Sequence, residues 1–107
     1  MGRYLFQGSY STEGIKGVLK EGGTGRKAAI DAAVKALGGR LEAYYFGFGD
    51  TDVYVIVDGI DNEAAAAFSM GVAATGAVHS VKTTVLLTPE EIDKAGKKTL
   101  SYRAPGH

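Results

Sequence analysis

Residues 46–57 read FGFGDTDVYVIV, and this stretch decides the fold. Two β-rich runs meet at a Gly-Asp pair, where glycine tolerates a positive φ angle and aspartate hydrogen-bonds to its own backbone. The pair predicts a turn between antiparallel strands that cover residues 41–48 and 53–57. Helix-like patterns precede and follow this hairpin, so we expect helices combined with an antiparallel sheet.

The segment before the hairpin is predicted to hold one strand and a broken helix. Residues 3–10 have the composition of a strand, and Thr12 offers an N-cap to a helix with apolar residues at helical spacing. Two glycines at 22–23 end that helix. A second helical stretch begins at Thr24 and ends at the glycines 38–39, so this connection holds two helices with a kink between them.

The segment after the hairpin predicts a turn, a helix and a last strand. Asp58 and Gly59 are typical turn residues. Asp61 is placed to cap an alanine-rich helix that runs to about Thr75. Residues 78–87 then have the pattern of a strand.

Residues 88–91 read TPEE and predict the start of an extra C-terminal helix. Thr88 is the N-cap, Pro89 takes the first helical position, and Glu91 completes a capping box. We expect residues 1–97 to form a single domain. Residues 98–107 show no strong periodicity and are expected to form an extended C-terminal tail.

The predicted order β-α-β-β-α-β is that of the ferredoxin-like, or split βαβ, fold, an α+β fold with its helices on one face of an antiparallel sheet. The second face then needs cover. In a chain of 107 residues, the simplest cover is the same face of a second copy related by a two-fold axis. We therefore expect a homodimer with a barrel-like space between two sheets. An exposed edge strand leaves room for a higher oligomer.

The composition limits the classes of partner. Twelve basic and twelve acidic residues leave no net charge, which disfavours nucleic acid because affinity for it depends on neutralised phosphates. The chain has no cysteine, so a reducing compartment, the cytoplasm, is expected. No run of about 18 apolar residues occurs, and the first residues lack the apolar core of a signal peptide. We therefore expect a soluble protein with no membrane partner.

Several short motifs occur in the same order as in a known family. They are EGGTGRK at residues 21–27, LGGRLEAYY at 37–45, FGDTD at 48–52, DN at 61–62 and GAV at 76–78. With them, nearly the whole chain resembles the GYD-domain family. The resemblance implies a ferredoxin-like subunit of the dimeric α/β-barrel type and no established activity. The family's Gly-x-Tyr-Asp reads GDTD at residues 49–52, so no role of that tyrosine passes to Thr51.

Alternation along the hairpin divides its side chains into two sets. The set predicted to face the helices and form core is Tyr44, Phe46, Phe48, Val53, Val55 and Val57. The set predicted to face the space between two subunits is Tyr45, Gly47, Asp52, Tyr54 and Ile56. Because phenols and a carboxylate suit a small ligand, Tyr45, Asp52 and Tyr54 are candidate ligand-binding residues. The simpler interpretation of the two tyrosines is that they are ordinary interface aromatics.

His79 opens the last predicted strand, where a neutral imidazole has the chemistry of a general base, a general acid or a ligand. Its position in the strand places it with Val81, Val85 and Leu87 on the more apolar face. A strand-end histidine bonded to backbone is the simpler interpretation.

Two further patterns fall short of sites. Asp50 and Asp52 offer two carboxylates where Ca²⁺ takes about six to eight oxygens, so they are interpreted as turn residues and no metal is expected. The glycine-rich run at residues 21–27 lacks the Gly-Lys-Ser/Thr of a P-loop. We interpret it as a helix break, with incidental anion binding as the alternative, and expect no cofactor.

Two functions from different classes remain open. The first, which we favour because polar groups are sparse, is a non-catalytic small-molecule-binding or assembly module that uses the inter-subunit sheet face. The second is a cofactor-independent isomerase or oxygenase acting on a small activated aromatic or lactone. In that case His79 or Asp52 would be the base, and Tyr45 or Tyr54 the hydrogen-bond donor, on the strength of fold analogy.

Overall fold

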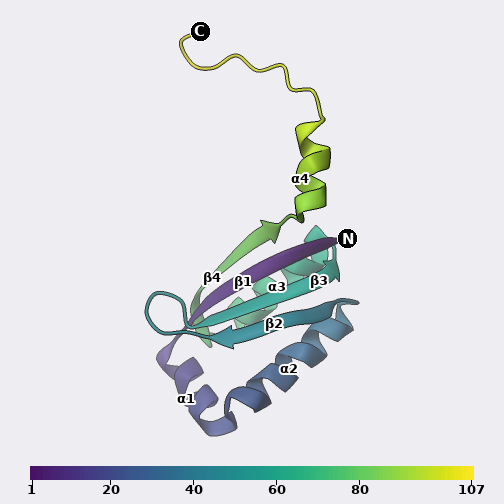
Figure 1. Ribbon diagram of the computed structural model, residues 1–107. Coiled ribbons are helices and arrows are strands. Elements are labelled where there is room, and N and C mark those ends of the chain that lie inside the picture. Colours follow the sequence, from purple (N-terminus) through teal and green to yellow (C-terminus); the bar gives the residue numbers. More distant parts are fainter.

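A four-stranded antiparallel sheet lies at the centre of the computed structural model, which describes residues 1–107 (Figure 1). Its strands follow the order β2-β3-β1-β4. Along the chain the elements are β1 (Gly2–Tyr10), α1 (Thr12–Glu21), α2 (Gly23–Ala36), β2 (Arg40–Phe46), β3 (Val53–Ile60), α3 (Asn62–Ala74), β4 (Val78–Leu86) and α4 (Pro89–Gly96). With α1 and α2 as a broken first helix, the predicted α+β ferredoxin-like fold is confirmed.

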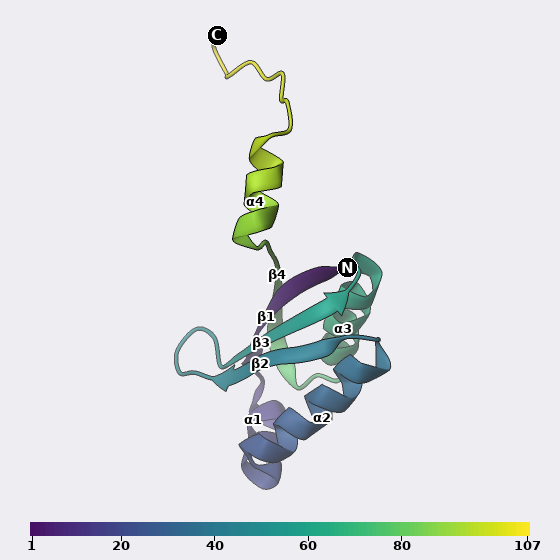
Figure 2. The ribbon, with the colours of Figure 1, turned by 45° about the vertical axis from the view of Figure 1, so that its right-hand side comes forward.

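The helices α2 and α3 cover one face of the sheet. α2 packs on β2, and α3 packs on β4 and β1. The core joins alternate strand residues to both helices, and its buried members are Tyr4, Phe6, Val53, Val55, Val57, Ile60, Val34, Ala65 and Phe68. The rings of Phe6 and Phe68 lie 4.6 Å apart between centroids. No helix crosses the other face of the sheet (Figures 1 and 2).

Three predicted helix boundaries are confirmed. Gly22, with a φ angle of 81°, separates α1 from α2. The carboxylate of Asp61 accepts a hydrogen bond from the backbone N–H of Ala64 at 2.8 Å and caps α3. At α4, the side chains of Thr88 and Glu91 each bond the backbone of the other residue and complete the capping box.

The N-cap of α1 is Ser11, so the prediction of Thr12 was wrong. The hydroxyl oxygen of Ser11 accepts a hydrogen bond from the N–H of Gly14 at 3.1 Å, and Thr12 lies inside the helix. The N–H of Ser11 donates to the carbonyl of Ala77 at 2.9 Å. Because this bond to a distant segment holds Ser11 in extended backbone, the helix begins after it.

The connection between β2 and β3 is a loop over residues 47–52, longer than the predicted tight turn. Phe48, predicted as core, is fully exposed there. The loop closes through a hydrogen bond from the N–H of Gly47 to the carbonyl of Asp52 at 2.8 Å. The N–H of Asp52 then donates to the carbonyl of Gly8 on β1 at 2.9 Å. These bonds end the β2–β3 pairing before residue 48 and leave Phe48 outside the sheet.

Asp58 and Gly59 lie within β3, where a turn was predicted. Arg3 pairs with Asp58 and Gly2 pairs with Ile60, so Gly59 is the extra residue of a β-bulge. Its φ angle of 82° is one that glycine adopts without steric cost. The strand therefore continues through a residue pair typical of turns.

α4 and the tail lead away from the sheet (Figures 1 and 2). α4 buries no residue, and Ile92, Leu100 and Tyr102 are exposed along this arm. Every helix in the structure is too short or too polar to cross a lipid bilayer.

Candidate functional site: the open face of the sheet

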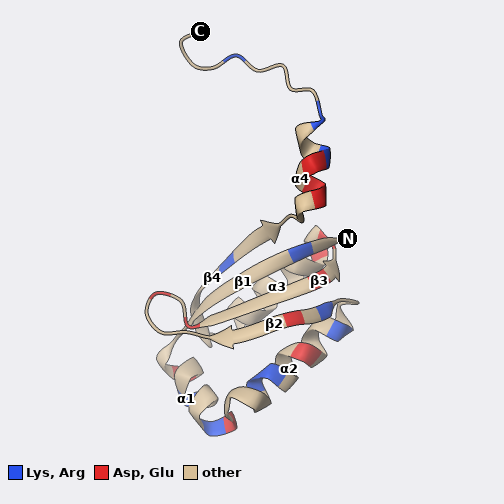
Figure 3. Ribbon diagram, viewed as in Figure 1, with Lys and Arg blue, Asp and Glu red and all other residues tan.

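The sheet face without a helix, here called the open face, is the candidate site. Residues that are paired across neighbouring strands have side chains on the same face of the sheet. The open-face residues are Arg3, Leu5 and Gln7 of β1, Ala43 and Tyr45 of β2, Tyr54, Ile56 and Asp58 of β3, and Lys82, Thr84 and Leu86 of β4. Figure 3 shows that charged positions gather at one end of β1 and β2.

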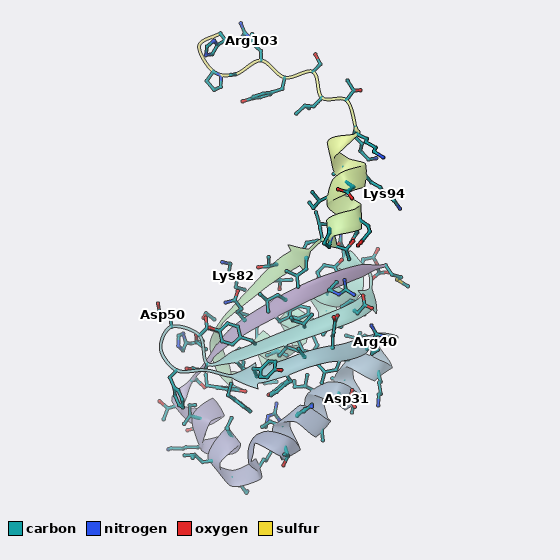
Figure 4. The ribbon with its side chains drawn as sticks, viewed as in Figure 1. Asp31, Arg40, Asp50, Lys82, Lys94 and Arg103 are labelled. Carbon is teal, nitrogen blue, oxygen red and sulfur yellow. The ribbon has the colours of Figure 1, made fainter.

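Four charged side chains form a network at that end. Nε of Arg3 donates to Glu42 at 2.7 Å, and a terminal nitrogen of Arg3 lies 3.6 Å from Asp58. Arg40, labelled in Figure 4, donates to the second oxygen of Asp58 at 2.8 Å. The hydrogen bond and the charge of Glu42, followed by the charge of Asp58, raise the pKa of Arg3. Two cations and two anions leave the network with no net charge.

Aliphatic and aromatic side chains share the rest of the open face with Gln7, Lys82 and Thr84. Leu5 pairs with Ile56 at its centre, and both are half-buried. Tyr45 lies directly opposite Tyr54 on the neighbouring strand, as the alternation predicted, and the two are 69% and 37% exposed. The open face thus has a charged end, a centre where Leu5 and Ile56 lie beside Thr84, and a phenolic end that also carries Gln7 and Lys82.

Asp52 is used to hold the hairpin loop. One carboxylate oxygen accepts a hydrogen bond from the backbone N–H of Tyr10 at 2.9 Å. The hydroxyl of Ser9 donates to the carbonyl of Asp50 and ties the loop to β1 a second time. One oxygen of the Asp52 carboxylate is therefore used to hold the loop against β1.

His79 lies on the helix side of the sheet, away from the tyrosine pair. It is the extra residue of a bulge in β4, is exposed, and lines a shallow hollow with Ser69 and Met70 of α3. Its imidazole makes no hydrogen bond, so the backbone-bonded interpretation was wrong. Of the four candidate residues, the structure brings together only Tyr45 and Tyr54.

A family model described as GYD domain matches residues 4–95 of the 107-residue chain. The chain belongs to the GYD-domain family. The match begins in β1 and ends in α4, so it takes in all of the sheet except Gly2 and Arg3, together with the helices that cover it. No curated protein matches this GYD domain.

The charged network of this GYD domain did not follow from strand alternation in the sequence. Glu42 reaches Arg3 because Glu42 is the extra residue of a bulge in β2, between Leu41 and Ala43. Strict alternation along β2 would have placed Glu42 on the helix side with Tyr44. The sequence feature that indicates the network is the pair of opposite charges at Arg40 and Glu42, on the strand that pairs with the strand of Asp58.

Proposed function

We propose that this GYD domain is a homodimeric small-molecule-binding or assembly module that pairs two copies through their open faces. The observation that carries the proposal is the uncovered face itself. Leu5 and Ile56 at its centre, and Leu86 beside Arg3, have no cover within the chain although each side chain is aliphatic. Burying such a surface against a second copy is favourable by about 25 cal/mol per Å² of apolar area.

The charged network supports the same interface. Charges are costly to bury unless they are paired and hydrogen-bonded. Arg3, Arg40, Glu42 and Asp58 are already paired with one another in the single chain. A second sheet laid over this end would meet no unpaired charge from the network.

A non-catalytic role is favoured over the enzymatic alternative. Asp52 is bonded to backbone, and His79 lies on the other side of the sheet from the tyrosine pair. In the dimer, Tyr45 and Tyr54 of each subunit would line the space between the sheets. Two phenols can both donate and accept hydrogen bonds, so a partly apolar metabolite is the kind of ligand that this space would hold.

Native mass spectrometry under gentle and then denaturing conditions tests the proposal. We expect a species of twice the chain mass of 11.1 kDa. Ile56→Glu, which places a charge at the centre of the open face, should yield monomer. Leu19→Glu is the matched control, because Leu19 is an exposed aliphatic residue on α1, and it should leave the dimer intact.

A wild-type monomer at micromolar concentration would refute the dimer. An extra mass retained by the dimer and lost on denaturation would identify a ligand. Its persistence in Tyr45→Phe combined with Tyr54→Phe would argue against the phenolic end as its site.

A further inference from the structure

The helix side of the sheet contains a cavity that belongs to one subunit alone. α2 packs on β2 while α3 packs on β4 and β1, so the two helices diverge above the central strands. Between them lies a partly enclosed cavity of about 110 Å³. It is on the opposite side of the sheet from the open face, and none of Tyr45, Asp52, Tyr54 and His79 lines it.

The walls of this cavity are mostly apolar. Phe6 and Val55 line it from the strands, Ile30 from α2, and Phe68 and Val72 from α3. An engineered apolar cavity of about 150 Å³ in another protein takes up benzene. A cavity of this size that is open at one end suits a single ring or a short branched chain.

One end of the cavity is polar. Tyr10, Tyr44 and Arg26 all contribute to the lining, and Arg26 is its only charged residue. Burial, followed by the Tyr10 hydroxyl, raises the pKa of Tyr44, while the charge of Arg26 acts in the opposite direction. All three residues line this one cavity. Two phenols and a guanidinium therefore converge at this end.

The polar end also borders a neighbouring groove. Tyr10, Arg26, Thr75 and Ala77 line both the cavity and a groove beside α1. Arg26 forms one ion pair, with Glu21 at 3.5 Å, which is longer than the 2.7 Å contact between Arg3 and Glu42, and Glu13 lines the same groove. Glu21 borders the groove and does not line the cavity. The guanidinium thus has donors left for an anion that enters from the groove.

We propose that this cavity binds a small carboxylic acid with an apolar body, of about the size of benzoate. The ring or branched chain would lie among Phe6, Val55 and Phe68, where it displaces no bonded polar group. The carboxylate would pair with Arg26, whose planar fork matches two carboxylate oxygens, and the tyrosine hydroxyls would supply further donors. A neutral ligand would leave Arg26 paired with Glu21 alone.

Chemical-shift mapping with sodium benzoate tests this proposal. We expect the amide signals of Val53, Val55, Val72 and Val78 to shift with saturation, and benzamide, the neutral analogue, to bind at least about tenfold more weakly. Arg26→Gln should weaken benzoate by a similar factor. Lys27→Gln is the matched control, because Lys27 is an exposed neighbouring cation outside the lining, and it should change the affinity less than about twofold.

A second variant fills the cavity. Val72→Phe should abolish the benzoate-induced shifts while its circular dichroism spectrum stays that of the wild type. If this variant does not fold, the comparison of Arg26→Gln with Lys27→Gln decides the question. Equal binding by those two variants, equal affinity for benzamide, or shifts confined to the open face would each overturn the proposal. Because the site lies within one subunit, benzoate should also bind monomeric Ile56→Glu, so this proposal and the dimer fail independently.

Discussion

At the scale of single residues, Gly14 shows how closely α1 approaches the loop before β4. A Cβ atom built on Gly14 would lie 1.9 Å from the carbonyl oxygen of Ala77, which is backbone and has little room to move. Gly14→Ala should therefore lower the free energy of unfolding by about 2 to 3 kcal/mol, since the helix must shift to relieve the contact. Urea denaturation followed by circular dichroism measures this change.

Gly17→Ala is the control for that prediction, because it makes the same chemical change in the same helix. A Cβ atom on Gly17 meets nothing within 4 Å. Alanine favours the helix over glycine by up to about 1 kcal/mol, so Gly17→Ala should leave the protein as stable as the wild type or more so. Similar losses of stability in both variants would contradict the steric argument.

At the scale of elements, the boundaries that were predictable from sequence rest on local hydrogen bonds. The cap of Asp61, the break at Gly22 and the box of Thr88 and Glu91 each involve residues within a few positions of one another. The errors fall where a distant segment decides the conformation. Ser11 replaces Thr12 as a cap because Ser11 bonds to Ala77, and that partner is invisible to a local pattern.

The capping box of α4 yields a prediction about pH. Hydrogen bonds from the backbone and side chain of Thr88, in that order, hold the pKa of Glu91 below its usual 4.5. The pKa of Glu91 is lower in the folded state than in the unfolded state. The box therefore stabilises the fold fully at a pH above the unfolded-state pKa, and this stabilisation is lost as the pH falls through the folded-state pKa. The side-chain carboxyl carbon of Glu91, followed by NMR, should titrate with a midpoint below 4.5. Thr88→Ala removes the hydroxyl and keeps the backbone donor, so it should move the midpoint part of the way upward, and an unchanged midpoint would refute the contribution of the Thr88 side chain.

At the scale of the whole molecule, the sequence was sufficient for the topology and insufficient for the site. Alternation along the hairpin is an intrinsic property of strands, so the pairing of Tyr45 with Tyr54 followed from it. The partner of Asp52 is Tyr10, 42 positions away, and it becomes visible only after β1 and β3 are aligned. The convergence of Arg26 with Tyr44 likewise depends on how α2 lies over the sheet.

The charged network offers a test of the dimer in which one substitution is measured in two states of the protein. In a monomer, an exposed ion pair contributes about 1 kcal/mol or less, so Glu42→Gln should barely change the unfolding of the monomeric Ile56→Glu variant. In the face-to-face dimer the same substitution leaves the guanidinium of Arg3 buried, with Asp58 as its remaining anionic partner. It should therefore weaken dimerisation by about tenfold or more. Sedimentation equilibrium measures that affinity.

Asp31→Asn, which breaks the exposed pair with Lys35 on α2 (Figure 4), should leave the dimer unchanged. If Glu42→Gln and Asp31→Asn alter dimerisation equally, the network lies outside the interface and the open faces do not meet.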